Sequence, residues 1–141
     1  MQDSSNRLLL VREWVEKAEN DLALAGQGLK MGADCPTDGV CFHAQQCVEK
    51  YLKALLVWKG IQFPKTHNIS ELFIGLKREL GKHLLNELDQ DRLTEYATVT
   101  RYPGDYEPIT LNEARLAVNL TRKVKAAVRK YLPKEALKKE K

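Results

Sequence analysis

Apolar residues follow one another at helical spacing through most of this chain. Between residues 7 and 30 they are separated alternately by four and three positions, as on the buried face of an amphipathic α-helix. This face consists of Val11, Val15, Ala18, Leu22, Ala25 and Leu29. A second helix is predicted over residues 38–59, with Thr37 or Asp38 as its N-cap, and its apolar side chains point in nearly every direction around the axis. Such a helix is expected at the centre of a fold.

Two more helices are predicted between residues 68 and 99. The first of them begins at the cap residue Asn68 or Ser70 and reaches about Leu80, where Gly81 interrupts the pattern. The next is shorter and spans about residues 84–99, where leucines recur at helical spacing.

The last predicted helix begins at Thr110 and ends at Pro133. Thr110 stands three residues before Glu113, which is the spacing of an N-terminal capping box. No segment shows the alternation of a strand. We therefore predict an all-α fold, an up-and-down antiparallel bundle of five helices, with residues 1–133 as one domain and residues 134–141 as a charged, frayed tail.

Composition supports one helical domain and places it in the cytoplasm. The chain has 141 residues, of which 43% are hydrophobic and 7% aromatic, and this excludes disordered and collagen-like proteins. Its longest apolar run, residues 54–58, is far shorter than the roughly 20 residues of a membrane helix. The first residues lack the basic and apolar regions of a signal peptide. Three cysteines spaced six apart, Cys35, Cys41 and Cys47, fit neither disulfides nor a zinc knuckle, so we expect reduced thiols, with Cys41 and Cys47 in the core.

Charge is unevenly distributed along the chain. The formal net charge is +4, yet residues 115–141 contain ten Lys or Arg against two Glu, so the rest of the chain is mildly acidic. A basic end of this kind favours binding to nucleic acid or to an acidic partner. Alternatively, these cations are solvated and complement the dipole of the last helix.

Few residues remain as candidates for chemistry. The sequence lacks the Glu-x-x-His pairs of di-iron bundles and the glycine loops of nucleotide folds, so we predict neither a metal nor a cofactor. The second helix carries one narrow polar stripe, formed by His43, Gln46, Lys50 and Lys53 with Glu49 beside it. His67 precedes the third helix, and a loop from Arg101 to Tyr106 precedes the last one.

Each of these candidates has a functional and a structural interpretation. Arg101 offers a planar cation for phosphate or carboxylate, or it fixes the loop that contains it. Tyr102 and Tyr106 stack on bases or pack the loop. Lys50 and Lys53 meet phosphates or extend out of an apolar helix to solvent.

Four segments resemble a known family. The stretch from Phe42 to Leu56, FHAQQCVEKYLKALL, closely resembles the central helix of HEPN domains (higher eukaryotes and prokaryotes nucleotide-binding). Residues 14–22 resemble the opening helix of that family, residues 65–69 its Lys-Thr-His turn, and residues 101–103 its loop before the last helix. The resemblance extends over about residues 10–132.

This resemblance implies a five-helix homodimer, often encoded beside a minimal nucleotidyltransferase as a toxin and antitoxin pair. Many HEPN proteins are metal-independent ribonucleases whose motif is Arg, four to six residues, then His. Here Arg101 matches the arginine, but Tyr106 follows the four intervening residues and no histidine occurs after His83. A tyrosine of reference pKa about 10 exchanges protons poorly at neutral pH.

Three hypotheses follow from these observations. In the first, a HEPN dimer binds a nucleotide or RNA phosphate through Arg101, Tyr102 and the polar residues His43, Lys50, Lys53 and His67, and pairs with a minimal nucleotidyltransferase. In the second, it is a ribonuclease toxin that uses Arg101 as a catalytic residue with Tyr106 or His67. In the third, it is a dimeric scaffold whose polar stripe is satisfied internally.

Overall fold

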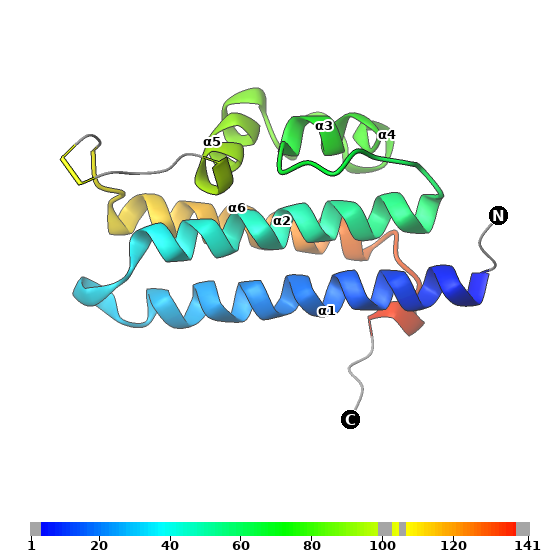
Figure 1. Cartoon of the computed structure of the whole chain (residues 1–141), viewed down its shortest axis with the longest axis horizontal. Helices are drawn as coiled ribbons and strands as arrows, with labels where there is room; N and C mark the ends of the chain where they lie inside the picture. The colour runs from blue at the N-terminus through cyan, green and yellow to red at the C-terminus, as the bar shows by residue number, and fades with distance from the viewer. Residues whose placement is uncertain (1–3, 99–102, 105–106, 138–141) are drawn as a thin grey trace.

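The computed structural model describes residues 4–98, 103–104 and 107–137, and within them it contains helices and no strands. The elements are α1 (Ser4–Leu29), η1 (Gly32–Asp34), α2 (Thr37–Lys59), α3 (Ile69–Ile74), α4 (Lys77–Leu80), α5 (Glu87–Thr98), α6 (Leu111–Arg129) and η2 (Lys134–Ala136). The long helices α1, α2 and α6 lie side by side, and α3, α4 and α5 lie along the other side of α2 (Figure 1). The prediction of an all-α bundle is confirmed.

Helix α2 is the centre of the bundle, as its all-round apolar pattern predicted. It contacts α1, α3, α5 and α6, and thirteen of its residues are buried. The fully buried side chains Tyr51, Leu52 and Leu55 form the middle of the core. Cys41 and Cys47 are buried, while Cys35 is half-buried. Burial raises the pKa of the Cys47 thiol, and the nearby carboxylates of Glu19 and Asp21 raise it further.

The ends of α2 differ in how they are formed. Gly60 adopts a left-handed conformation with φ 71° and its N–H group bonds to the carbonyl groups of Leu56 and Val57, which ends the helix. At the other end the N-cap is Pro36, with no side-chain cap. The prediction of Thr37 or Asp38 as the cap was therefore wrong, because the helix begins one position earlier and includes both residues.

The region between α2 and α6 contains shorter helices than predicted. Asn68 is the N-cap of α3 and accepts a hydrogen bond from the Glu71 N–H group at 3.1 Å, as one of the two predicted caps. The helix does not continue to Leu80, because it stops at Gly75 and resumes as α4. A Cβ atom on Gly75 would lie 3.2 Å from the Leu56 side chain, so this glycine allows the chain to pass close to α2.

Side-chain caps also define the start of the last two helices. The Asn86 side chain accepts a hydrogen bond from the Asp89 N–H group at 2.8 Å, and α5 therefore begins at Glu87, later than predicted. Thr110 is the N-cap of α6 and accepts from the Glu113 N–H group at 3.0 Å, as predicted. Helix α6 ends at Arg129, before Pro133.

Two further findings concern the chain end and membranes. Residues Lys134–Ala136, in the segment expected to fray, form the short helix η2, which packs against α1 with Ala136 buried. Among the residues that the structure describes, no helix is long and apolar enough to cross a membrane.

Candidate functional site

The polar stripe of α2 lies where α2 meets α1 and the turn before α3, and two carboxylates organise it. The first is Asp21 of α1, which is almost completely buried. Its oxygen Oδ1 lies 2.8 Å from His43 Nδ1, and its oxygen Oδ2 accepts a hydrogen bond from the Lys50 ammonium group. His43 and Lys50 are seven positions apart and therefore share one face of α2, where a single carboxylate can hold both.

The second carboxylate is Glu49 of α2, whose side chain is 4% exposed. Its oxygen Oε1 lies 2.8 Å from His67 Nδ1 and accepts from the Gln45 amide at 3.0 Å. Its oxygen Oε2 accepts from Lys53 at 3.1 Å. Gln46 donates to the Gln45 oxygen at 2.7 Å. We call the two carboxylates, their partners and Gln46 the α2 polar cluster, which consists of Asp21, His43, Gln45, Gln46, Glu49, Lys50, Lys53 and His67.

Hydrogen bonds outweigh burial in setting the charge state of Glu49. Burial by itself raises the pKa of this carboxyl, but donors from Gln45, His67 and Lys53 together hold it below the ordinary value for Glu. The Lys53 ammonium group also lies 5.4 Å from the centre of the Trp14 ring and 6.0 Å from that of Phe63. The Lys53 ammonium group therefore has both a counterion, Glu49, and aromatic faces around it in place of water.

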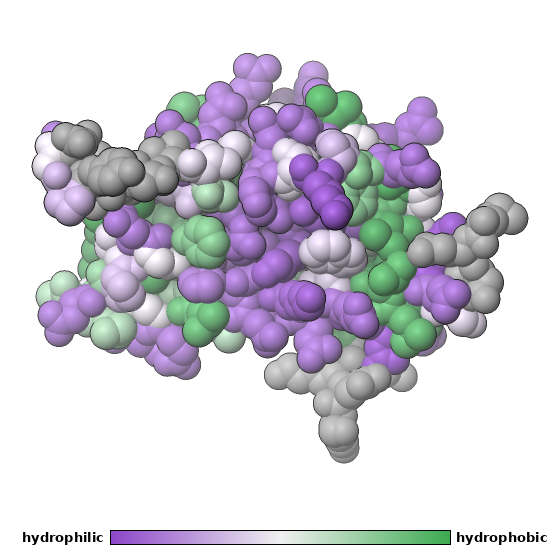
Figure 2. All heavy atoms as spheres, in the orientation of Figure 1, coloured by the Kyte–Doolittle hydropathy of each residue, from purple (hydrophilic) through white to green (hydrophobic). Residues whose placement is uncertain are grey.

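Exposure separates the histidines of the cluster from its lysines. The side chains of His67 and His43 are 59% and 32% exposed, whereas those of Lys50 and Lys53 are 21% and 10% exposed. Figure 2 shows polar side chains gathered over the middle of the face on which α1 and α2 lie side by side. A ligand in solvent thus reaches the two imidazole groups more easily than the two ammonium groups.

The structure brings four of the predicted site residues into this cluster and describes none of the other three. His43, Lys50, Lys53 and His67 come together around Asp21 and Glu49. Arg101, Tyr102 and Tyr106 lie outside the described residues. Their predicted roles stay predictions.

The turn that contains His67 is attached to α5. The Ile69 N–H group donates a hydrogen bond to Thr94 Oγ1 at 3.0 Å, and that hydroxyl donates to the Gln90 carbonyl at 2.8 Å. Thr94 lies one turn before Thr98, the last described residue of α5. Because α5 leads into the segment that contains Arg101, the fold connects the Lys-Thr-His turn and this segment through one short helix.

Sequence reasoning missed the role of Asp21 and a second polar group on the other side of α1. There the Tyr51 hydroxyl donates to Glu19, which also accepts from Lys125 at 2.8 Å, and Arg129 donates to the Tyr51 oxygen at 3.2 Å. Tyr51 was indistinguishable from an apolar core residue in the helical pattern. The signal available for Asp21 was its position beside Leu22, where a charged residue borders the apolar face of α1.

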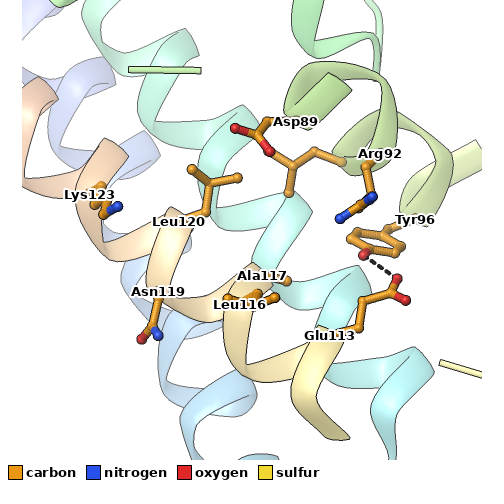
Figure 3. Close-up of a pocket in the computed structure, with 10 residues that line it drawn as sticks. Asp89, Arg92, Tyr96, Glu113, Leu116, Ala117, Asn119, Leu120 and Lys123 are labelled. Carbon is orange, nitrogen blue, oxygen red and sulfur yellow. Dashed lines mark hydrogen bonds between the residues drawn. The ribbon is translucent and has the colours of Figure 1, made fainter. Parts of the chain in front are cut away.

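A groove between α5 and α6 has a volume of about 540 Å³ (Figure 3). Asp89, Arg92 and Tyr96 extend into it from α5, and Glu113, Leu116 and Lys123 line it from α6. The Tyr96 hydroxyl donates to Glu113 at 2.6 Å, which is the hydrogen bond drawn in the figure. Burial and this contact both raise the pKa of Tyr96. Leu116 is 61% exposed at the rim, so the groove combines an apolar surface with charges of both signs.

Within the described ranges, no group of three or more His, Cys, Asp or Glu side chains is arranged to hold a metal ion. His43 and His67 each pair with a different carboxylate, and Lys50 and Lys53 accompany these pairs. Such an arrangement can orient an imidazole for hydrogen bonding or proton exchange.

Comparison with known proteins finds a family model and a named relative. A family model described as HEPN domain matches residues 11–131. A protein of Methanocaldococcus jannaschii named "Putative toxin MJ1304" is 34% identical over 113 residues, which are 75% of this chain and 72% of that relative. No solved structure matches this chain.

Proposed function

The chain belongs to the HEPN domain family, and we propose that it is a toxin-like HEPN protein whose homodimer binds a nucleotide or RNA phosphate and pairs with a minimal nucleotidyltransferase. The observation that carries this proposal is the 34% identity to a relative named as a toxin, over three quarters of the chain. The family match extends over nearly all of the described bundle.

The geometry of the α2 polar cluster supports different roles for its lysines and its histidines at the phosphate site. Lys53 and Lys50 are each engaged by a carboxylate, so their main effect is to hold Glu49 and Asp21 in place. His67 and His43 present their imidazoles at the surface as hydrogen-bond donors to a phosphate. Arg101 supplies the fixed cation in this proposal, because it matches the arginine of the family motif.

The α5–α6 groove is the surface that best supports a homodimer. In a two-fold interface each patch meets its own copy, so a patch that contains both charge signs can complement itself. Asp89 and Glu113 stand in this groove with Arg92 and Lys123, and Leu116 is exposed between the charges. We therefore expect Leu116→Glu to convert the dimer into a monomer in sedimentation experiments, whereas Leu9→Glu on the exposed side of α1 leaves it dimeric.

Binding measured on the purified protein tests the phosphate site. Titration with ATP and with a short single-stranded RNA is expected to give an affinity that falls at least tenfold in Arg101→Ala. Arg78→Ala, an exposed arginine on α4, is the matched control and should keep the wild-type affinity. Equal affinity of wild type and Arg101→Ala would refute the proposal, and failure to co-purify with a co-expressed nucleotidyltransferase would refute the pairing.

A ribonuclease activity is the second candidate, and the position of His67 favours it. This imidazole is oriented by Glu49, is exposed, and belongs to a turn bonded to α5 shortly before Arg101. It therefore meets the need for a group that exchanges protons near neutral pH better than Tyr106 does. RNA cleavage in the presence of a chelator should then disappear in both Arg101→Ala and His67→Ala and persist in Tyr106→Phe. Intact RNA with the wild-type protein would exclude this candidate.

A further inference from the structure

A cationic surface lies on a different side of α1 from the α2 polar cluster. It is a cleft of about 570 Å³ between α1 and α6, lined by Leu22, Arg122, Lys125, Ala126, Arg129 and Lys130. Asp21 faces the α2 polar cluster, whereas the next residue, Leu22, lines this cleft. Consecutive helical residues point about 100° apart, so α1 separates the two surfaces. We call this surface the α6 basic cleft.

The sequence of α6 places these cations on one face. Arg122, Lys125 and Arg129 are separated by three and four positions, so their side chains follow one another along the helix. Ala126 lies among them and leaves room because its side chain is small. The adjoining face of α6, about 100° around the axis, is buried against the core through Val118, Thr121, Val124 and Val128.

A hydrogen-bond network fixes the inner wall of the cleft. Arg129 donates to the Tyr51 oxygen at 3.2 Å, and Tyr51 in turn donates to Glu19. Lys125 donates to the other oxygen of Glu19 at 2.8 Å. Burial alone raises the pKa of Glu19, but the hydrogen bonds from Lys125 and Tyr51 hold it below its ordinary value. Arg129 is therefore oriented before any ligand arrives, which lowers the cost of binding.

The outer wall of the cleft carries positive charge that no ion pair among the described residues neutralises. Arg122 and Lys130 are exposed, and neither takes part in an ion pair within the described part of the chain. The described residues that line the cleft include four cations and no carboxylate. Such a surface attracts anions and releases counterions when they bind.

We propose that the α6 basic cleft binds the phosphate backbone of single-stranded RNA, without reading its sequence. Arg and Lys side chains are donors only, and a phosphate chain offers acceptors, whereas an acidic peptide would also bring N–H donors, and none of the described side chains that line the cleft accepts a hydrogen bond. From Arg122 to Lys130 the cations extend over about 12 Å of helix axis, enough for several phosphates. Among the described residues that line the cleft, none is an aromatic residue that could stack on a base. The choice of RNA rests on the proposed function.

The test is fluorescence anisotropy with a labelled twelve-nucleotide oligouridylate and the matching oligoadenylate, titrated with the full chain at several salt concentrations. The variant Arg122→Ser/Lys130→Ser removes the two exposed cations. Its affinity is expected to fall at least tenfold for both oligonucleotides, and the slope of log K against log salt to decrease by about 1.4, since each lost contact with a single strand contributes about 0.7. The matched control Lys77→Ser/Arg78→Ser removes an exposed Lys and Arg from α4 and should bind as wild type does.

Other outcomes overturn the inference. Unchanged affinity in the cleft variant, or an equal loss in the α4 control, would show that no binding surface is localised at this cleft. Full competition by a twelve-residue polyglutamate peptide at the concentration of the RNA would identify an acidic protein as the ligand, and full competition by ATP would identify a mononucleotide. Loss of binding in Arg101→Ala with an unaffected cleft variant supports only the proposed function, and the reverse pattern supports only the cleft.

Discussion

The α2 polar cluster and the α6 basic cleft both contain lysines on long helices, but they differ in how those charges are balanced. In the cluster, Lys50 and Lys53 each meet a buried carboxylate. In the cleft, four cations line the surface, and the Glu19 carboxylate accepts hydrogen bonds from Lys125 and Tyr51 from the α1 side. The cluster is therefore satisfied within the fold, while the cleft keeps positive charge for an external partner.

The difference follows from the hydrophobic pattern of the two helices. Helix α2 is apolar in almost every direction along its buried middle, so the polar side chains buried there must find partners inside the protein. Helix α6 has one buried face and one solvated face, and its cations need no partner to remain charged. A lysine count does not distinguish these cases, whereas the surroundings of each lysine do.

The largest expected effect comes from removing a carboxylate of the α2 polar cluster. Glu49→Leu leaves Lys53 buried without a counterion and removes an acceptor of Gln45 and His67. Breaking a buried pair in this way costs about 3 kcal/mol or more of unfolding free energy. Urea denaturation followed by circular dichroism measures this loss.

A double variant separates the cost of the unpaired charge from the value of the pair. In Glu49→Leu/Lys53→Met both charges are replaced by apolar groups, so most of the lost stability should return. A double variant as unstable as Glu49→Leu, or a single variant within about 0.5 kcal/mol of wild type, would contradict the interpretation of a balanced buried pair.

Acidification tests the contribution of the Glu49 carboxylate to stability without replacing its side chain. The pKa of Glu49 in the folded protein lies below the ordinary value of 4.5, so its contribution to stability is present above that pH and is lost as the pH falls through the folded pKa. Urea midpoints measured from pH 6 to pH 3 should therefore fall steeply at the acidic end. Glu49→Gln should flatten this decline, whereas Glu95→Gln, at an exposed site on α5, should keep the wild-type profile.

The sequence was sufficient for the bundle because helical periodicity is a local signal. Asn68 and Thr110 were recognisable as caps, and α2 as the central helix, from their neighbours alone. The break between α3 and α4 was missed because Gly75 matters through its close approach to Leu56, a residue 19 positions earlier. Local patterns contain no information on such a contact.

The candidate site was predictable only in part for the same reason. The polar stripe on α2 is a local pattern, and His67 was singled out by its turn. Asp21, which holds two of these residues, lies on another helix, and its role depends on how α1 packs against α2. The cations of α6 were visible as a charge bias, but which of them share a cleft depends on the packing against α1.

Tyr51 connects the core to the cleft, and its hydroxyl should make a moderate contribution. Tyr51→Phe removes the donor to Glu19 and the acceptor of Arg129 while it keeps the ring in the core. Loss of hydrogen bonds of this kind costs about 1–2 kcal/mol, less than the loss of Glu49. Because Arg129 is no longer oriented, RNA affinity should also fall by a few-fold. An unfolding free energy equal to that of the wild type would show that the network does not stabilise the fold.

The smallest effect on stability is expected at Arg122, where the effect on RNA binding is large. Arg122→Ala removes an exposed side chain that forms no ion pair among the described residues, so the unfolding free energy should change by less than about 0.5 kcal/mol. RNA affinity should nevertheless decline, because the lost cation no longer releases a counterion on binding. Lys53→Met should show the opposite behaviour, with lower stability and unchanged affinity for RNA at the cleft. If Arg122→Ala and Lys53→Met lowered the unfolding free energy equally, the charges of the cleft and of the cluster would not differ in how they are balanced.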